Sequence, residues 1–371
     1  MSSRLLHLGL LPVVLCLGLG LTSVAHADLT PEQTARVLAG MDTDAFGDAA
    51  KHLALSTDFA KKTSKDWESY DAKIGQPIEK WARKKLPTHA GQTIFYPFAG
   101  PDFPTVHRLY PDADRYVLIA LQTAGHVPDL EGMSDKRLKA VFNLFKDGVG
   151  NFARRGFFHT KKMNEQFEKS PVVEGITGVM MAFAVREGYK VTHVRPIRVA
   201  DSGEIEVLDP ATPGRNVWDS VRIDLDKGGR KVVLDYLQLD LSDGNLKHNT
   251  AHRSFIRKVA GNRVVLKAAS HLMQQQGFAT IRDALLERAT SVWQDETGLP
   301  YTPLAAQFDV DLYGDFSHVN VLFDQEPQRA LKRAYETRDD VQNLPFQVGY
   351  RKEAGSCLQV AHTRKTPALA Q

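Results

Sequence analysis

Cysteine is almost absent from this chain of 371 residues, which contains only Cys16 and Cys357. Cys16 lies in an N-terminal apolar stretch that we expect to be removed, so the mature chain could form no disulfide within itself, although an export route usually permits disulfides. Its stability must therefore come from packing. We interpret Cys357 as a small buried residue of the last strand and not as a nucleophile.

A strong charge of one sign is also lacking. The chain has 47 basic and 44 acidic residues, a formal net charge of +3, which is too small an excess to indicate nucleic acid or an anionic membrane surface. Charged residues make up 25% and hydrophobic residues 43%, the balance of an ordinary globular protein. We expect no nucleic-acid partner, and the sequence leaves the oligomeric state open.

Signatures of familiar catalytic and metal sites are missing as well. The chain has no G-x-S-x-G, no P-loop and no Cys-x-x-Cys. His248 and His252 have a spacing that suits metal ligands on a helix, but His248 is expected to precede the helix. A stretch that begins like an EF-hand at Asp309 has Tyr313 and Asn320 where ligands are required. We assign no metal site and no known cofactor.

The N-terminus carries the clearest targeting signal. Residues 1–27 contain one basic residue, an apolar run over 5–21 and an A-x-A pattern that ends at Ala27. This is the pattern of a secretory signal peptide. Pro12 and Gly18 interrupt the run, which argues against a retained anchor, so we expect no stable membrane span after cleavage. The mature chain would begin at Asp28 and act in the periplasm or outside the cell.

Residues 28–90 are predicted to form a helical N-terminal extension. Thr30 and Pro31 are typical of a helix start. Apolar residues then recur at spacings near three and four, which indicates one buried helical face: Trp67, Tyr70, Ile74, Ile78, Trp81 and Leu86.

Residues 91–371 are predicted to form one mixed α/β domain, a Rossmann-like sheet with antiparallel hairpin additions. Segments 93–98 and 115–121 are apolar on both faces, which suits strands buried between helices. We expect helices over 103–109, from 134, over 174–187, and from 250 to 289 with breaks near Asn262 and Gly277. Further strands are expected over 189–197, 217–225, 230–239, 291–294, 308–313, 319–323, 346–350 and 357–360.

The loop after the first of these strands is the best candidate for a ligand site. In parallel sheets, ligands bind beyond the carboxyl ends of the strands. Gly100 would allow close backbone approach, and Asp102 either caps the next helix or projects a carboxylate into the crevice. Gln122 would lie at the end of the neighbouring strand.

Two further groups of polar residues have alternative interpretations. Asp240 and Asp243 follow a strand and are either ordinary turn residues or oxygen ligands and an acid–base pair. Lys267, Ser270 and His271 are expected on one face of a helix, where most such groups are partly exposed.

Several blocks resemble an uncharacterised family of bacterial secreted or periplasmic proteins with a YPF-x-G-x-D-F motif. The run IFYPFAGPDFPTVHRLYPDADRYVLIALQTAG is similar to segments that read YPFSG-D-F, then a helix, then Y-V-L-x-G-L-E-x-x-G. DYLQLDLSDGNL, LKAASHLM and QDETGLP look like the same family. The resemblance implies that these blocks form one domain, and it implies no activity.

The strand, glycine turn, helix and second strand also resemble the Rossmann-like core of nucleotide- and adenosylmethionine-binding enzymes of the methyltransferase type. In that fold an acid at the end of the second strand holds ribose hydroxyls. This chain has the neutral Gln122 there and only one glycine of the G-x-G pattern. The resemblance thus implies the shape without the cofactor.

Three function classes follow from these features, and the sequence leaves open whether the protein is an enzyme. The first is an exported ligand-binding or structural envelope protein, with a small molecule as the possible ligand. The second is a secreted hydrolase or metal-assisted enzyme that uses Asp102, Asp240 and Asp243. The third is a nucleotide- or adenosylmethionine-dependent enzyme.

The leader yields the first testable prediction. When the chain is produced in a bacterium with a general secretion pathway, the intact mass should equal that of residues 28–371, because cleavage follows Ala27. Mass spectrometry of the exported protein measures this directly. A retained full-length mass in that fraction would contradict the prediction.

Overall fold

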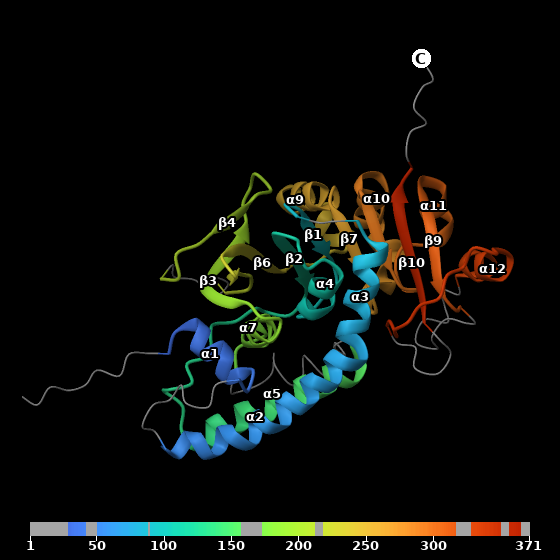
Figure 1. Ribbon diagram of the computed structural model, residues 1–371. Helices are drawn as coiled ribbons and strands as arrows, with labels where there is room; N and C mark the ends of the chain where they lie inside the picture. The colour runs from blue at the N-terminus through green and yellow to red at the C-terminus, as the bar shows by residue number, and fades with distance from the viewer. Residues whose placement is uncertain are drawn as a thin grey trace, which may run out of the picture.

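The computed structural model describes residues 29–41, 50–87, 90–156, 173–211, 218–316, 328–349 and 356–364 (Figure 1). The helices are α1 (Pro31–Leu38), α2 (Ala50–Tyr70), α3 (Gln76–Lys85), α4 (Phe103–Leu109), α5 (Asp135–Arg155), α7 (Thr177–Arg186), α8 (Asp243–Leu246), α9 (Thr250–Ala260), α10 (Ala279–Arg288), α11 (Tyr301–Gln307) and α12 (Arg329–Thr337). A π-helical turn η1 (Asp71–Gly75) joins α2 to α3, and two 3-10 helices, η3 (Ala269–Gln274) and η4 (Gln276–Phe278), precede α10.

The strands form one ten-stranded sheet in the order β4-β3-β5-β6-β2-β1-β7-β8-β10-β9. They are β1 (Thr93–Tyr96), β2 (Arg115–Ala120), β3 (Lys190–Val199), β4 (Ile205–Val207), β5 (Val221–Lys227), β6 (Arg230–Gln238), β7 (Arg263–Leu266), β8 (Ser291–Gln294), β9 (Phe308–Gly314) and β10 (Cys357–Thr363). The central strands β6, β2, β1, β7 and β8 are parallel. Antiparallel strands flank them on both sides. The predicted mixed α/β fold is confirmed.

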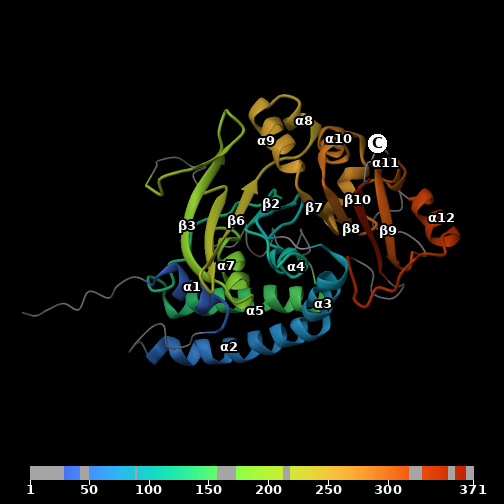
Figure 2. The same ribbon diagram turned by 45° about the horizontal axis from the view of Figure 1, so that its top comes forward.

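Helices cover both faces of the sheet. Figures 1 and 2 show α9 and α10 on one side and α1, α2, α5 and α7 on the other. The side chains of β2 alternate accordingly: Tyr116 and Leu118 belong to the core under α5 and α7, whereas Val117 and Ile119 belong to the core under α9 and α10. This explains why the strand is apolar on both faces, as the sequence predicted.

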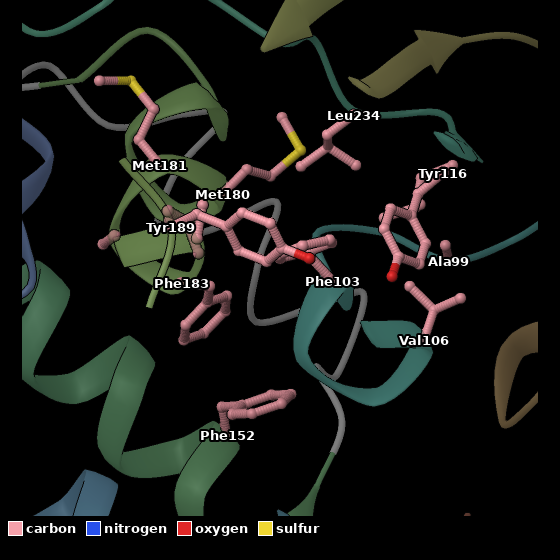
Figure 3. Close-up of a cluster of buried hydrophobic side chains, with 14 of the residues drawn as sticks. Ala99, Phe103, Val106, Tyr116, Phe152, Met180, Met181, Phe183, Tyr189 and Leu234 are labelled. Atoms are coloured by element: carbon pink, nitrogen blue, oxygen red, sulfur yellow. The ribbon is translucent and has the colours of Figure 1, made fainter. Parts of the chain in front are cut away.

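Helices α1 to α3 share the first of these cores. Phe59 of α2 stacks on Phe142 of α5 with ring centroids 4.7 Å apart, and Trp67 lies 5.7 Å from Phe183 of α7. Phe183 in turn lies 4.9 Å from Phe152 of α5, and Phe103 of α4 lies 6.0 Å from Tyr189 in the same core (Figure 3). Residues 31–38 and 50–85 are helical, and they pack against the sheet layer.

Helix starts agree with the sequence prediction where capping is local. Thr30 accepts a hydrogen bond from the Gln33 backbone, and the Gln33 side chain accepts one from the Thr30 backbone, a complete capping box. Ser134 caps α5 in a similar way through the Arg137 backbone. Such caps need only residues three positions apart.

Two expected elements differ from the structure. Residues 263–266, expected within a helical region, form β7 in the middle of the sheet. Their apolar run, 264–266, is too short to show whether its period is that of a helix or of a strand. Lys267, Ser270 and His271 therefore follow a strand and do not share one face of an α-helix. Residues 346–349, expected as a strand, are irregular. The apolar Phe346 is buried there because its ring packs edge-on against Trp81, with ring centroids 5.5 Å apart. The predicted strand at 319–323 and Tyr350 lie outside the described residues.

Within the described residues, none of the helices combines the length and the apolar character needed to cross a membrane. The predicted signal peptide, residues 1–27, lies outside this part of the chain.

A buried polar network joins the end of α7 to α4. Glu187 is 4% exposed, and its Oε2 lies 2.7 Å from Arg108 Nε and 3.7 Å from His107 Nε2. Burial raises the pKa of Glu187 to about 7, although Arg108 opposes the shift. Burial, together with the charges of Lys227 and Arg108, lowers the pKa of His107 well below its ordinary value. Both groups are therefore poorly solvated in their charged forms.

Glu187 predicts a specific pH dependence of stability. The unfolded chain loses this proton near pH 4.5, whereas the folded protein keeps it to about pH 7. The stabilisation that comes from the protonated Glu187 carboxyl is therefore fully present below pH 4.5, and it is lost as the pH rises to about 7. Relative to Glu187→Gln, which has no such proton to lose, the wild type should lose about 3 kcal/mol across this window.

Urea unfolding of both proteins at a series of pH values measures this difference. The titration of His107 works in the opposite direction, but it occurs in both proteins and largely cancels in the comparison. A difference that stays constant, or that grows in favour of the wild type with rising pH, would show that Glu187 has no raised pKa.

Candidate functional site

A cavity of about 300 Å³ opens beyond the carboxyl ends of four neighbouring parallel strands. It is lined by residues of 96–102 at the end of β1, 120–122 at the end of β2, 239–241 at the end of β6 and 267–272 after β7, and by Phe278. β1 and β7 are adjacent at the point where the order of the parallel strands reverses. That is the position at which open α/β sheets bind ligands.

Asp102 serves both as a helix cap and as part of the cavity wall. Its Oδ1 accepts a hydrogen bond from the Thr105 backbone at 3.3 Å at the start of α4. Its Oδ2 lies 3.1 Å from the Tyr96 hydroxyl and 2.7 Å from Lys267 Nζ. The side chain is 2% exposed. Both alternatives that the sequence offered for this residue are therefore present together.

Lys267, which the sequence analysis expected with Ser270 and His271 on one face of a helix, instead lies in the wall of this cavity beside Asp102. Its side chain is 5% exposed, and its ammonium group contacts Asp102, the Thr105 hydroxyl at 2.8 Å and the Gly156 carbonyl at 2.7 Å. Since an ammonium has three donors, all of them are used. The pairing of Lys267 with Asp102 was not predicted, because residues 264–266, directly before it, were expected to be helical and not to end a strand at the cavity.

Strained backbone surrounds the cavity on two sides. Gly100 has φ of 58°, which favours glycine, but Phe98 and Ala268 also have φ of 59°. The Ala268 backbone N–H donates to Asp295 Oδ2 at 2.9 Å, which holds this turn in place. Left-handed non-glycine residues are costly and are concentrated at ligand sites.

The walls of the cavity are largely apolar. Phe98 and Phe278 meet edge-on with ring centroids 5.9 Å apart. Gln122 is 3% exposed, and its backbone carbonyl accepts a hydrogen bond from the Tyr236 hydroxyl at 2.6 Å. Leu121 at the rim is 59% exposed; of the large hydrophobic side chains that the structure describes, only Met41 is also exposed. An exposed leucine beside a cavity offers apolar surface to a ligand.

The two carboxylates of the 240–245 loop have different places. Asp240 lines the cavity, and its oxygens accept hydrogen bonds from the Ser242 backbone and hydroxyl, each at 2.8 Å. Asp243 is not part of the wall: it accepts from the Thr280 backbone at 2.8 Å and pairs with Lys247 at 3.1 Å. The structure thus brings Gly100, Asp102, Gln122 and Asp240 to one cavity and leaves Asp243 beside it.

The other sequence candidates lie elsewhere. His248 precedes α9, whose N-cap is Asn249, as the sequence predicted. Cys357 is fully buried in β10 with its sulfur 3.4 Å from Glu296 Oε2, as expected for a core residue. In the described part of the chain, no group of three or more His, Cys, Asp or Glu side chains is arranged to hold a metal ion.

Comparison of the chain with protein-family models, curated proteins and solved structures gives no match. The cavity itself is therefore the basis for inferring what the protein does. The cavity is lined by a buried ion pair, by apolar side chains and by one carboxylate at the rim.

The buried ion pair yields a prediction. Lys267→Met leaves Asp102 buried without its cation, and Asp102→Asn leaves the ammonium without its anion, so each should cost about 3 kcal/mol of unfolding free energy. The double variant should lose at least about 2 kcal/mol less than the sum of the two, because it leaves no unpaired charge.

Urea unfolding of the four proteins measures the cycle. Asparagine keeps an oxygen for the Thr105 backbone, so loss of the cap contributes little to the Asp102→Asn result. Strictly additive losses would mean that the two charges do not stabilise each other.

Proposed function

We propose that this protein binds a small, mainly apolar organic molecule in the cavity between the ends of β1, β2, β6 and β7. The observation that carries the proposal is the position of the cavity at the reversal of strand order, with strained loops on two sides of it. The apolar walls and the few polar groups are typical of small-molecule sites. In this proposal the ligand binds to a Rossmann-like scaffold, and any structural role of the protein depends on that binding.

The strand order supports that scaffold. Numbered along the chain, the parallel strands β1, β2, β6, β7 and β8 lie in the order 3-2-1-4-5. This matches the corresponding part of the doubly wound dinucleotide-binding sheet. Antiparallel strands extend both edges and do not interrupt the parallel centre.

The groups that usually hold a nucleotide are not in their places. Gly100 is the single glycine of the β1 loop, and the end of β2 carries neutral Gln122 in place of a ribose-binding acid. A nucleotide- or adenosylmethionine-dependent enzyme is therefore the less supported alternative.

A hydrolase is the second candidate, because Asp102 and Asp240 line the same cavity. Asp102, however, is already bound to Lys267, Tyr96 and the Thr105 backbone. A general acid or base must exchange protons with a substrate. The contacts of Asp102 favour a supporting role beneath a ligand.

We also propose that the protein acts after export, in the periplasm or outside the cell. The support is the signal-peptide pattern of residues 1–27. A ligand present in that compartment is then the relevant one.

Binding can be tested with 1-naphthalenemethanol, an uncharged bicyclic alcohol, by titration calorimetry on the purified protein. We expect one molecule to bind per chain. Leu121→Ser should weaken binding about fivefold, since the ligand would cover leucine surface worth about 1 kcal/mol. Native mass spectrometry of the protein from its own compartment complements this test by revealing a ligand that copurifies.

Met41→Ser is the matched control, because Met41 is also an exposed large hydrophobic residue but does not line the cavity. It should leave the affinity unchanged. Failure of the alcohol to bind, or equal weakening by both variants, would overturn the assignment of this cavity as the binding site.

A further inference from the structure

The charges around the cavity do not balance. Asp102 and Lys267 lie 2.7 Å apart and neutralise each other. Asp240 is a further charged residue of the lining, with no cation placed against it by any contact that the structure describes. His271 also lines the cavity, but partial burial lowers its pKa below the ordinary value, so it is neutral near pH 7. The wall therefore carries one net negative charge.

From this imbalance we infer that the ligand is an organic cation, with an ammonium or similar group at Asp240 and an apolar body against Leu121, Phe98 and Phe278. This inference rests on the proposed function and names the chemical class of its ligand. It selects amines with an aromatic or aliphatic body and excludes phosphates and carboxylates.

The geometry of Asp240 suits this role. Ser242 donates one hydrogen bond to each carboxylate oxygen, which fixes the orientation of the group. Each oxygen keeps a further lone pair that can accept from a ligand. Hydrogen bonds between an ammonium and a carboxylate are charge-assisted and stronger than neutral ones.

The aromatic lining favours the same sign of charge. Tyr96, Phe98 and Phe278 contribute rings to the wall, and the faces of such rings attract cations. An anionic ligand would meet no available cation among the described lining residues, since the ammonium of Lys267 already uses its three donors on Asp102, Thr105 and Gly156. Both features oppose a dinucleotide phosphate.

Three probes with one ring system separate charge from apolar contact. They are 1-naphthylmethylammonium, 1-naphthalenemethanol and 1-naphthoate, compared by calorimetry at pH 7 and low ionic strength. We expect the ammonium to bind about tenfold more tightly than the alcohol, and the carboxylate more weakly than the alcohol. Added salt should weaken only the binding of the ammonium.

Asp240→Asn should reduce the affinity for the ammonium to about that of the alcohol, and it should change the affinity for the alcohol much less, because the alcohol carries no charge. Asparagine retains an oxygen acceptor for the Ser242 backbone, so the loop should keep its turn. Asp243→Asn is the matched control: its carboxylate is held by Thr280 and Lys247 outside the wall, and the order of the probes should persist.

The outcomes are distinguishable. If the alcohol and the ammonium bind equally to the wild type, with no effect of salt, the cation inference fails while the cavity stands as the binding site. If the carboxylate binds most tightly, the inference is likewise overturned. If none of the probes binds, the proposed function itself fails.

Discussion

A buried ammonium group requires acceptors for its donors and a negative charge close by, and Lys267 obtains both from three separate parts of the chain. Asp102 belongs to the loop after β1, Thr105 to the first turn of α4, and Gly156 to the end of α5. The anion lies at a helix N-terminus and the cation at a helix C-terminus, which is favourable for each helix dipole. The pair thereby fixes both helices against the end of β7 and forms the floor of the cavity.

The remaining features of the cavity follow from this constraint. Because the two buried charges satisfy each other, the floor offers no free charge to a ligand. In the function that we propose, specificity then depends on the apolar walls and on Asp240 at the rim. The backbone strain at Phe98 and Ala268 lies in the two loops that the ion pair connects, so one interaction helps to stabilise both costly turns.

The sequence predicts those parts of the structure that depend on neighbouring residues. These parts are helix α4 and its cap Asp102, the hairpin of β5 and β6, and the helix start at Thr30, and all of them arise from contacts within a few positions. The turn at Asp240 is equally local, since its partner is Ser242. The pattern of residue types along the chain and their spacing are therefore enough to predict these caps and turns.

Lys267 and β7 could not be obtained in the same way. Lys267 contacts Thr105 and Gly156 across separations of 162 and 111 residues, and β7 is a strand only because β1 and β8 pair with it. Topology brings the loop ends of β1 and β7 together, and this fixes where a ligand would lie before any particular side chain is considered. What the ligand is then depends on the side chains that face the space. The chemistry of the proposed ligand is therefore better inferred from three side chains than from the strand order: Gln122, Lys267, which is paired with Asp102, and Asp240, which contacts no cation in the described part of the chain.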